Sequence, residues 1–308
     1  MPSLSSDIEL FYHPPYDWPR LLRFFSGRSS AQVETVIDGV YLRTLEWQGD
    51  EGLLSVRQDP ARDCLIARID GPASVHLPAL VPRLRRLFDL DLEPCRLHAA
   101  LDSDPWLGRL LQRTPGLRVP GAWSTFELVV RTIVGQQVSV KAATTIAGRL
   151  AERAGRPVAN PLHAQVAWQF PTPAALAEVN LDRIGMPGKR VAALQNFAAV
   201  VASHQVSIEA FADEHTRVDL GPLRKALLAL PGIGPWTVEY VAMRAWRDTD
   251  AWPGTDLVVM QEITREHPEL LKPGHQLLRS EAWQPWRAYA VMYLWNEIMD
   301  RSGAQRGG

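Results

Sequence analysis

A change in the spacing of apolar residues near position 116 constrains the fold of this 308-residue chain more than any other feature. Before it, short runs rich in β-branched and aromatic residues are separated by turns that contain Asp and Gly. Such runs predict the strands of an antiparallel meander, and we expect them at 33–37, 40–47, 52–57 and 65–69. Two amphipathic segments, 18–25 and 77–88, are expected to form helices that cover one face of the sheet.

The segment 115–121, PGLRVPG, marks the change, and helical spacing dominates from there onward. Ser124 and Glu127 have the spacing of a capping box, so a helix is expected to begin at Ser124. Further helices are expected at 138–153, 173–179, 190–203, 208–212, 221–230, 235–246, 256–266 and 283–301. The sequence therefore predicts an α+β protein. An N-terminal domain of residues 1–115 would hold a TBP-like antiparallel sheet with covering helices, and an all-helical domain would follow over 116–308.

Charge and cysteine content exclude several classes of protein. The formal net charge is -1, so binding to nucleic acid would depend on a local site rather than on overall charge. The two cysteines, Cys64 and Cys95, are too few for a disulfide framework, an all-cysteine zinc site or a four-cysteine iron–sulfur cluster. The eight histidines are scattered without ligand spacing, which argues against a metal-dependent hydrolase.

The sequence predicts neither a leader peptide nor a membrane span. The first residues lack a basic region followed by an apolar one, and no run of about 18 apolar residues occurs. No period of about 20–50 residues recurs, which disfavours a helical-repeat protein. We therefore expect a cytoplasmic protein.

The segment 230–240, LPGIGPWTVEY, lies between two apolar helical stretches. Residues 231–234 are expected to form a tight turn, and Pro235 suits the first position of the second helix. Glycines at 232 and 234 would allow left-handed backbone angles and the close approach of another backbone. N–H groups at the start of the second helix can bind a phosphate, and carbonyl oxygens of the turn can hold a monovalent cation. An ordinary connection between two helices explains a Pro-Gly-x-Gly pattern equally well.

Asp256 follows in the segment 252–259, WPGTDLVV, at the start of an expected helix. An Asp in such a place is more often a helix N-cap than a catalyst. The two roles are compatible, because the N–H groups that hold a capping carboxylate also favour its ionised form. Such a carboxylate can stabilise positive charge that develops nearby. Trp236 and Tyr240 lie four residues apart on one helix face, and that spacing alone favours a buried stripe over a binding pocket.

The hairpin followed by Asp256 resembles the helix-hairpin-helix DNA glycosylase superfamily. The resemblance is to its AlkA-type family, the 3-methyladenine DNA glycosylases II, and it extends from about Phe11 to Trp295. The segments that carry it occur in order across both expected domains: PPYDW at 14–18, VETV at 33–36, RLFDL at 86–90, PGLRVPG at 115–121, GQQVSV at 135–140, GMP at 185–187, KR at 189–190 and PWRAYA at 285–290.

The resemblance implies a base-excision repair enzyme that flips alkylated bases out of double-stranded DNA and hydrolyses their N-glycosidic bonds. 3-Methyladenine, 7-methylguanine and others would be released, with no metal or cofactor required; the turn has room for a structural monovalent cation. Asp256 stands where the family's catalytic Asp stands. Trp236, Tyr240 and Trp295 match its base-pocket aromatics. The residues implied to contact DNA are Gln137, Gly232, Ile233, Gly234 and Thr237.

Three positions qualify what the resemblance implies. Gln137 stands where the family usually has an apolar wedge, and Asn296 replaces an aromatic. Trp236 occupies the position of the lysine that bifunctional members use for a Schiff base, so the resemblance implies a monofunctional glycosylase that leaves an abasic site. Lys225 is expected to face solvent or a phosphate. The implied enzyme is a monomer associated with the bacterial nucleoid when bound to DNA.

A non-catalytic helix-hairpin-helix DNA-binding protein is the alternative function. The two hypotheses differ in what Asp256 would do. A module that only binds DNA has no use for a carboxylate close to the phosphate backbone, where like charges weaken affinity. Asp256 therefore favours the enzyme.

Overall fold

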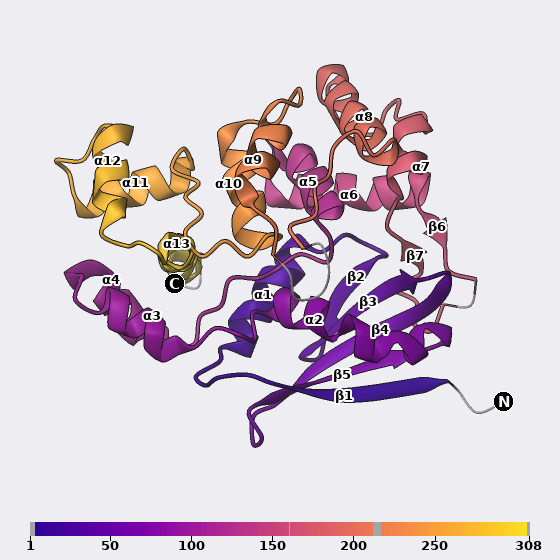
Figure 1. Cartoon of the computed structure of the whole chain (residues 1–308), viewed down its shortest axis with the longest axis horizontal. Coiled ribbons are helices and arrows are strands. Elements are labelled where there is room, and N and C mark those ends of the chain that lie inside the picture. Colours follow the sequence, from indigo (N-terminus) through magenta and orange to yellow (C-terminus); the bar gives the residue numbers. More distant parts are fainter. Residues whose placement is uncertain (1–3, 160, 212–216, 307–308) are drawn as a thin grey trace.

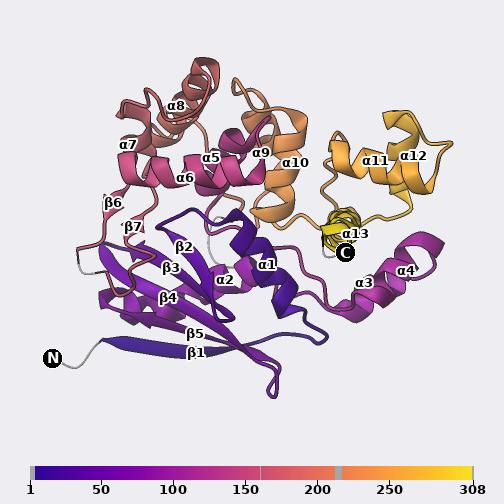
Figure 2. The same cartoon turned by 180° about the vertical axis from the view of Figure 1, so that it is seen from behind.

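The computed structural model describes residues 4–159, 161–211 and 217–306. An antiparallel sheet with covering helices forms one side of the molecule, and helices alone form the other (Figure 1). The C-terminal helix α13 (Arg287–Arg306) lies between the pair α3–α4 and the pair α11–α12 in both views (Figures 1 and 2). The α+β class expected from the sequence is confirmed.

The sheet has five strands in the order β1-β5-β4-β3-β2, and all neighbours are antiparallel. Their bounds are Ser5–Phe11 (β1), Glu34–Ile37 (β2), Val40–Trp47 (β3), Asp50–Asp59 (β4) and Cys64–Asp70 (β5). The four expected strand segments are therefore confirmed as β2 to β5. β1 was not expected, because only Leu10 within it is buried and its strand state comes from full-length pairing with β5.

Helices α1 (Trp18–Arg28) and α2 (Leu77–Phe88) cover the sheet, as the amphipathic segments predicted. Asp17 caps α1 by accepting the backbone N–H of Arg20 at 3.1 Å. The apolar face of α2 is buried together with Phe25 of α1 and Tyr41 of β3, whose rings pack against Phe88. A short 3-10 helix, Pro72–His76, joins the sheet to α2. The N-terminal sheet thus has its own apolar core.

The remaining helices build a second, larger core. Their bounds are Pro94–Leu101 (α3), Pro105–Arg113 (α4), Thr125–Gly135 (α5), Val140–Ala154 (α6), Pro173–Glu178 (α7), Gly188–Ala202 (α8), Leu220–Leu228 (α9), Pro235–Arg244 (α10), Leu257–Glu266 (α11) and Pro273–Glu281 (α12). Two two-residue strands, Arg156–Pro157 (β6) and Trp168–Gln169 (β7), pair between α6 and α7. Helix α5 begins where the capping box predicted, and Ser124 Oγ accepts the N–H of Glu127 at 3.1 Å. Only this half of the box is present, because the Glu127 carboxylate accepts Arg43 and Arg131 instead.

The expected helix at 208–212 is wrong for residues 208–211, and Ala212 lies outside the described residues. Ile208 is buried, and its carbonyl accepts the indole N–H of Trp246 at 2.9 Å. Phe211 forms an isolated bridge with Arg217. A five-residue segment has too few internal hydrogen bonds to offset helix nucleation, so these tertiary contacts determine its conformation.

Three helices were not expected from the sequence: α3, α4 and α12. α3 and α4 precede residue 115, yet their apolar side chains belong to the core of the helical part. Each begins with a proline, and Asp104 caps α4 by accepting the N–H groups of Trp106 and Leu107. The division of the chain at residue 115 stays a prediction.

Candidate active site

The hairpin consists of α9, a turn at 229–234 and α10. Gly232 has a φ of +81°, and a Cβ there would lie 2.7 Å from the Cβ of Ala193, so the turn requires glycine on both counts. Gly234 has a φ of -98° and precedes α10 as its N-cap, and a Cβ there would meet no atom of a described residue within 4 Å. Of the two glycines that could adopt left-handed angles, only Gly232 does so.

The turn leaves main-chain donors open. Within the described residues, the N–H groups of Gly234, Trp236 and Thr237 have no hydrogen-bond acceptor in the chain. Ile233 differs, because its N–H donates to the carbonyl of Leu230 at 3.2 Å and its side chain is buried. The Thr237 side chain is also buried. The turn can therefore offer a phosphate main-chain N–H groups at the start of α10, while Ile233 anchors it to the core.

Asp256 is the N-cap of α11, and its carboxylate accepts three hydrogen bonds. Oδ1 accepts the N–H of Val259 at 2.9 Å and the indole N–H of Trp295 at 3.2 Å, and Oδ2 accepts the indole N–H of Trp236 at 2.8 Å. The capping role expected from the sequence is thus present. Three donors from three different helices hold the carboxylate in one orientation.

The three predicted pocket aromatics lie together beside this carboxylate. The rings of Trp236 and Tyr240 are stacked, with centroids 5.0 Å apart and planes at 12°, and Trp295 meets Tyr240 edge-on at 6.0 Å. All three line a cavity of about 650 Å³ that also contains Asp256. None of the three rings is fully buried. Trp236 and Tyr240 therefore line a cavity, and Tyr240 also packs against the apolar core of the helical part.

Arginines are the part of the cavity that sequence reasoning missed. Arg28 of α1, Arg131 of α5 and Arg244 of α10 all line it. Arg244 is buried, and it donates to the Tyr240 hydroxyl at 2.7 Å and to the carbonyls of Pro120 and Gly121, each at 2.8 Å. Arg244 follows Tyr240 by four residues, so its place on the same helix face could have been found from the spacing.

These arginines change the acidity of Tyr240. Burial by itself would raise the pKa of the phenol, but the neighbouring charges of Arg244, Arg28 and Arg131 outweigh burial and lower the pKa. Burial also lowers the pKa of Arg244. The cavity therefore contains cationic groups that favour acceptor atoms and negative charge around Tyr240.

Gln137 lies outside the lining of the cavity. It is exposed and has a φ of +56°, in the loop between α5 and α6. Its neighbour Gln136, which sequence reasoning overlooked, donates from Nε2 to the carbonyl of Gly232 at 2.8 Å. The loop that carries Gln137 is thereby attached to the hairpin turn.

Asn296 and Lys225 are also away from the cavity. Asn296 is buried between α13 and α1, where its Oδ1 accepts Arg20 Nη1 at 2.6 Å. Lys225 is exposed on α9, as expected. At position 296, where the family resemblance implies an aromatic, Asn296 therefore forms a hydrogen bond between α13 and α1.

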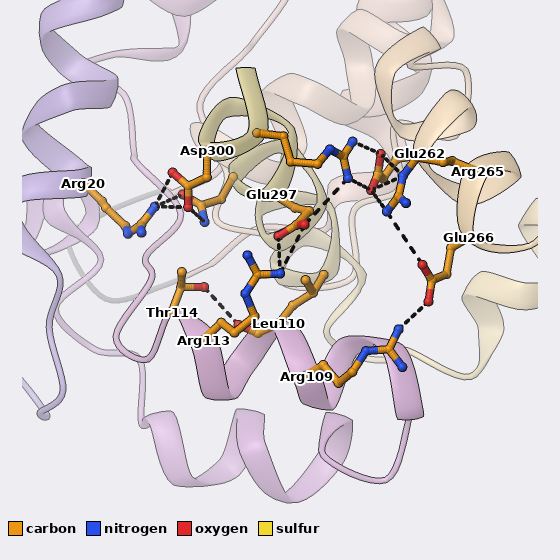
Figure 3. A network of polar contacts seen from close by, with 12 residues as sticks. Arg20, Arg109, Leu110, Arg113, Thr114, Glu262, Arg265, Glu266, Glu297 and Asp300 are labelled. Atoms are coloured by element: carbon orange, nitrogen blue, oxygen red, sulfur yellow. Dashed lines mark hydrogen bonds and ion pairs between the residues drawn. The ribbon is translucent and has the colours of Figure 1, made fainter. Parts of the chain in front are cut away.

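Ion pairs fix the helix that carries Asp256. Figure 3 shows the carboxylate of Glu262, on α11, paired with Arg265, and Glu266 of the same helix paired with Arg109 of α4. Arg301 also pairs with Glu262. The Glu262 side chain is 2% exposed, whereas Arg265 and Arg301 are 50% and 37% exposed, so the pairs lie at the edge of the buried region. Because Arg301 lies on α13, the network ties the helix of Asp256 to the helix of Trp295.

The described part of the chain offers neither a membrane span nor a metal centre. No helix within it is both long and apolar enough to cross a bilayer. No group of three or more His, Cys, Asp or Glu residues in the same ranges is arranged to hold a metal ion.

The structure thus brings together a helix-hairpin-helix turn, an aromatic cavity and a capping carboxylate at the wall of that cavity. Residues 130–288 match the family described as HhH-GPD superfamily base excision DNA repair protein. Residues 7–124 match the AlkA N-terminal domain. The chain belongs to the HhH-GPD superfamily, with an AlkA-type N-terminal domain.

Relatives within and around that superfamily carry more specific names. The chain is 36% identical to the probable bifunctional transcriptional activator/DNA repair enzyme AlkA of Mycobacterium tuberculosis over 94% of its own length, and it spans 57% of that relative. It is 32% identical to DNA-3-methyladenine glycosylase 2 of Escherichia coli, over 93% of this chain and 95% of that protein. The 3-methyladenine DNA glycosylase of Archaeoglobus fulgidus has the same fold, with a TM-score of 0.78 at 21% identity and coverage of 96% and 98%. The family resemblance expected from the motifs is confirmed.

Proposed function

We propose that this chain is a monofunctional DNA glycosylase that releases alkylated bases from double-stranded DNA and leaves an abasic site. The observation that carries the proposal is the Asp256 carboxylate, held by Trp236 and Trp295 at the wall of the aromatic cavity. The name of the Escherichia coli relative, DNA-3-methyladenine glycosylase 2, supports glycosylase activity, and the name of the Mycobacterium tuberculosis relative supports a role in DNA repair. 3-Methyladenine and 7-methylguanine are the proposed substrates.

The reaction follows from the cavity and its carboxylate. A nucleotide turned out of the duplex would stack on the Trp236–Tyr240 pair, and a cationic alkylpurine gains about 1–2 kcal/mol from the faces of such rings. As the N-glycosidic bond breaks, positive charge develops on the deoxyribose. The Asp256 carboxylate stabilises that charge and orients the water that attacks the sugar. The alkylated base leaves without a strong general acid, because its own positive charge weakens the bond.

The position of Trp236 supports hydrolysis without strand cleavage. A lyase needs an amine that can form a Schiff base with the sugar. Trp236 stands at the second position of α10, and no lysine is among the described residues that line the cavity. The product would therefore be an intact strand with an abasic site.

Contact with DNA would be made by the hairpin and the loop of Gln137. The open N–H groups of Gly234, Trp236 and Thr237 would bind a phosphate, and Gln137 would enter the space left by the flipped nucleotide. A monovalent cation would fit the carbonyl oxygens of Leu228 and Ile233, which accept no hydrogen bond from the described residues. It would add positive charge close to that phosphate. We further propose that the enzyme acts as a monomer on the nucleoid in the bacterial cytoplasm.

Base release from methylated duplex DNA tests the proposal. The wild type should release 3-methyladenine and 7-methylguanine, and Asp256→Asn should slow release at least about 10³-fold while it still binds the duplex. Equal release by both proteins would refute catalysis by Asp256. If neither protein releases a base but both bind DNA, the non-catalytic alternative is correct. Strand breaks that form without alkali would contradict the monofunctional assignment.

A further inference from the structure

Four charged residues, three buried and one half-buried, lie between the sheet and the cavity. Glu34 comes from β2, Arg43 from β3, and Glu127 and Arg131 from α5. The side chains of Glu34, Arg43 and Glu127 are each 3% exposed. We call these four residues the interface cluster. It is the point at which the N-terminal sheet reaches the wall of the candidate active site.

The interface cluster is closely paired. Arg43 donates to Glu127 at 2.5 Å and to Glu34 at 3.3 Å, and Arg131 Nη1 lies 2.7 Å from Glu34 Oε1 and 3.3 Å from Glu127 Oε1. The Tyr41 hydroxyl donates to the second oxygen of Glu34 at 2.6 Å. Burial by itself would raise the pKa of Glu34, but Arg131 and Arg43 lower it, so the carboxylate stays ionised. Two cations and two anions leave the cluster neutral.

Arg131 is the one member of the interface cluster that also lines the cavity. Its side chain is 19% exposed. The other charged residues in the lining are Arg28, Arg244 and Asp256. Without compensation, three cations and one carboxylate would surround the base. Since the proposed substrates are cationic, that excess positive charge would oppose their binding.

We propose that Glu34 of the N-terminal sheet is a positioning residue for the active site: it holds and neutralises Arg131, and so sets the preference of the cavity for cationic over neutral bases. This inference rests on the proposed glycosylase function and adds a determinant of specificity to it. It also gives the N-terminal sheet a role in base selection. Loss of the Glu34 charge would leave the cluster with one unpaired positive charge close to the base.

The ratio of two release rates tests this role. DNA that contains 7-methylguanine supplies a cationic base, and DNA that contains hypoxanthine supplies a neutral one. Glu34→Gln keeps the size of the side chain and should lower the ratio of 7-methylguanine to hypoxanthine release about tenfold. Arg131→Met should raise the ratio, because it leaves the cluster with an excess negative charge. The double variant is neutral again and should return the ratio toward the wild-type value.

Asp89→Asn is the matched control. Asp89 is also a buried carboxylate that joins the two parts of the chain, since it pairs with Arg247 and accepts the hydroxyl of Tyr289, but it does not line the cavity of Asp256. Its substitution should lower thermal stability and leave the release ratio unchanged. A purely structural role of Glu34 predicts the same behaviour for Glu34→Gln, and that result would overturn the proposal. A double variant that keeps the ratio of Glu34→Gln would overturn it as well.

Binding provides a second measurement that needs no catalysis. Duplexes can carry a cationic pyrrolidine or a neutral tetrahydrofuran in place of one nucleotide. Glu34→Gln should weaken binding of the pyrrolidine duplex relative to the tetrahydrofuran duplex, and an unchanged ratio would contradict the inference. If the wild type releases no methylated base, the proposed function is wrong. The ratio of pyrrolidine-duplex to tetrahydrofuran-duplex affinity still tests the role of Glu34 in that case, because it needs no base release. If Glu34→Gln does not fold, the ratios of Arg131→Met decide it, and a value equal to wild type would refute the proposal.

Discussion

The hairpin turn and the part of the cavity wall formed by α10 belong to the same short segment, 229–244, yet they are held in opposite ways. At the wall, Trp236 and Arg244 donate from their side chains to partners that lie far away in the sequence or on the same helix face. At the turn, the backbone conformation of Gly232 sets the shape, and N–H groups at the start of α10 stay open. The wall is fixed mainly by side-chain hydrogen bonds, and the turn mainly by the backbone conformation of Gly232, with one side-chain hydrogen bond from Gln136.

This difference separates the steps that each region should control. A side chain at the wall acts on a base that has already entered the cavity. A change at the turn acts on the phosphate contact that precedes base release. Substitutions at the wall should therefore alter stability or single-turnover release, and substitutions at the turn should alter duplex affinity. The predictions below are ordered from the largest expected effect to the smallest.

Arg244→Met should have the largest effect. It removes a buried cation that donates to Tyr240, Pro120 and Gly121, and leaves two buried carbonyls without that donor. We expect a loss of about 3 kcal/mol in the free energy of unfolding, measured by chemical denaturation. Arg23→Met is the control, because the Arg23 side chain is 53% exposed and its ion pair with Asp300 should contribute less than about 1 kcal/mol. Similar losses in the two variants would show that the wall is not held by Arg244.

Gly232→Ala should weaken binding of undamaged duplex DNA about tenfold. The left-handed angle at 232 costs a residue with a Cβ about 1–2 kcal/mol, and that Cβ would also meet Ala193 at 2.7 Å. Gly234→Ala is a matched control in the same turn, since its backbone is extended and the space beside it is open. Single-turnover release at saturating enzyme should stay near the wild-type rate in both variants. A turn variant that binds duplex DNA normally but releases the base slowly would contradict the proposal that the turn controls affinity and the wall controls release.

Trp236→Phe should slow single-turnover release about tenfold and leave duplex affinity near the wild-type value. The ring remains available for stacking, but the carboxylate of Asp256 loses the donor at 2.8 Å, which is worth about 1.5 kcal/mol for a bond to a charged group. Trp286→Phe is the control, because Trp286 lies outside the cavity of Asp256. Equal rates for the two variants would mean that the indole N–H does not position the carboxylate.

Local features of the candidate site could be predicted from the sequence, and features that depend on the packing of distant segments could not. The turn, the capping Asp256 and the stripe of Trp236 and Tyr240 each occupy one short segment with a fixed helical spacing. The contributions of Arg28 and Arg131 depend on how the packing of the two parts brings α1 and α5 to one cavity, which no local pattern encodes. Strand β1 was missed for the same reason, because its extended conformation depends on pairing with β5, which is distant in the sequence. The motifs that carried the family resemblance made the remaining assignment of Trp295 possible.

Gln136→Ala should have the smallest effect. It tests most directly which residues control duplex affinity, as the turn should, and which control base release, as the cavity wall should. Gln136 is part of the loop after α5, but its amide donates to the carbonyl of Gly232, so it supports the turn from the side of the cavity. Loss of one partly exposed hydrogen bond of 2.8 Å should cost about 0.5–1 kcal/mol, or a two- to fivefold loss of duplex affinity. Release from bound DNA should not change. If release slows instead, Gln136 acts through the loop of Gln137 on the flipped nucleotide. In that case the part of the segment that controls base release begins at Gly232 rather than at the start of α10.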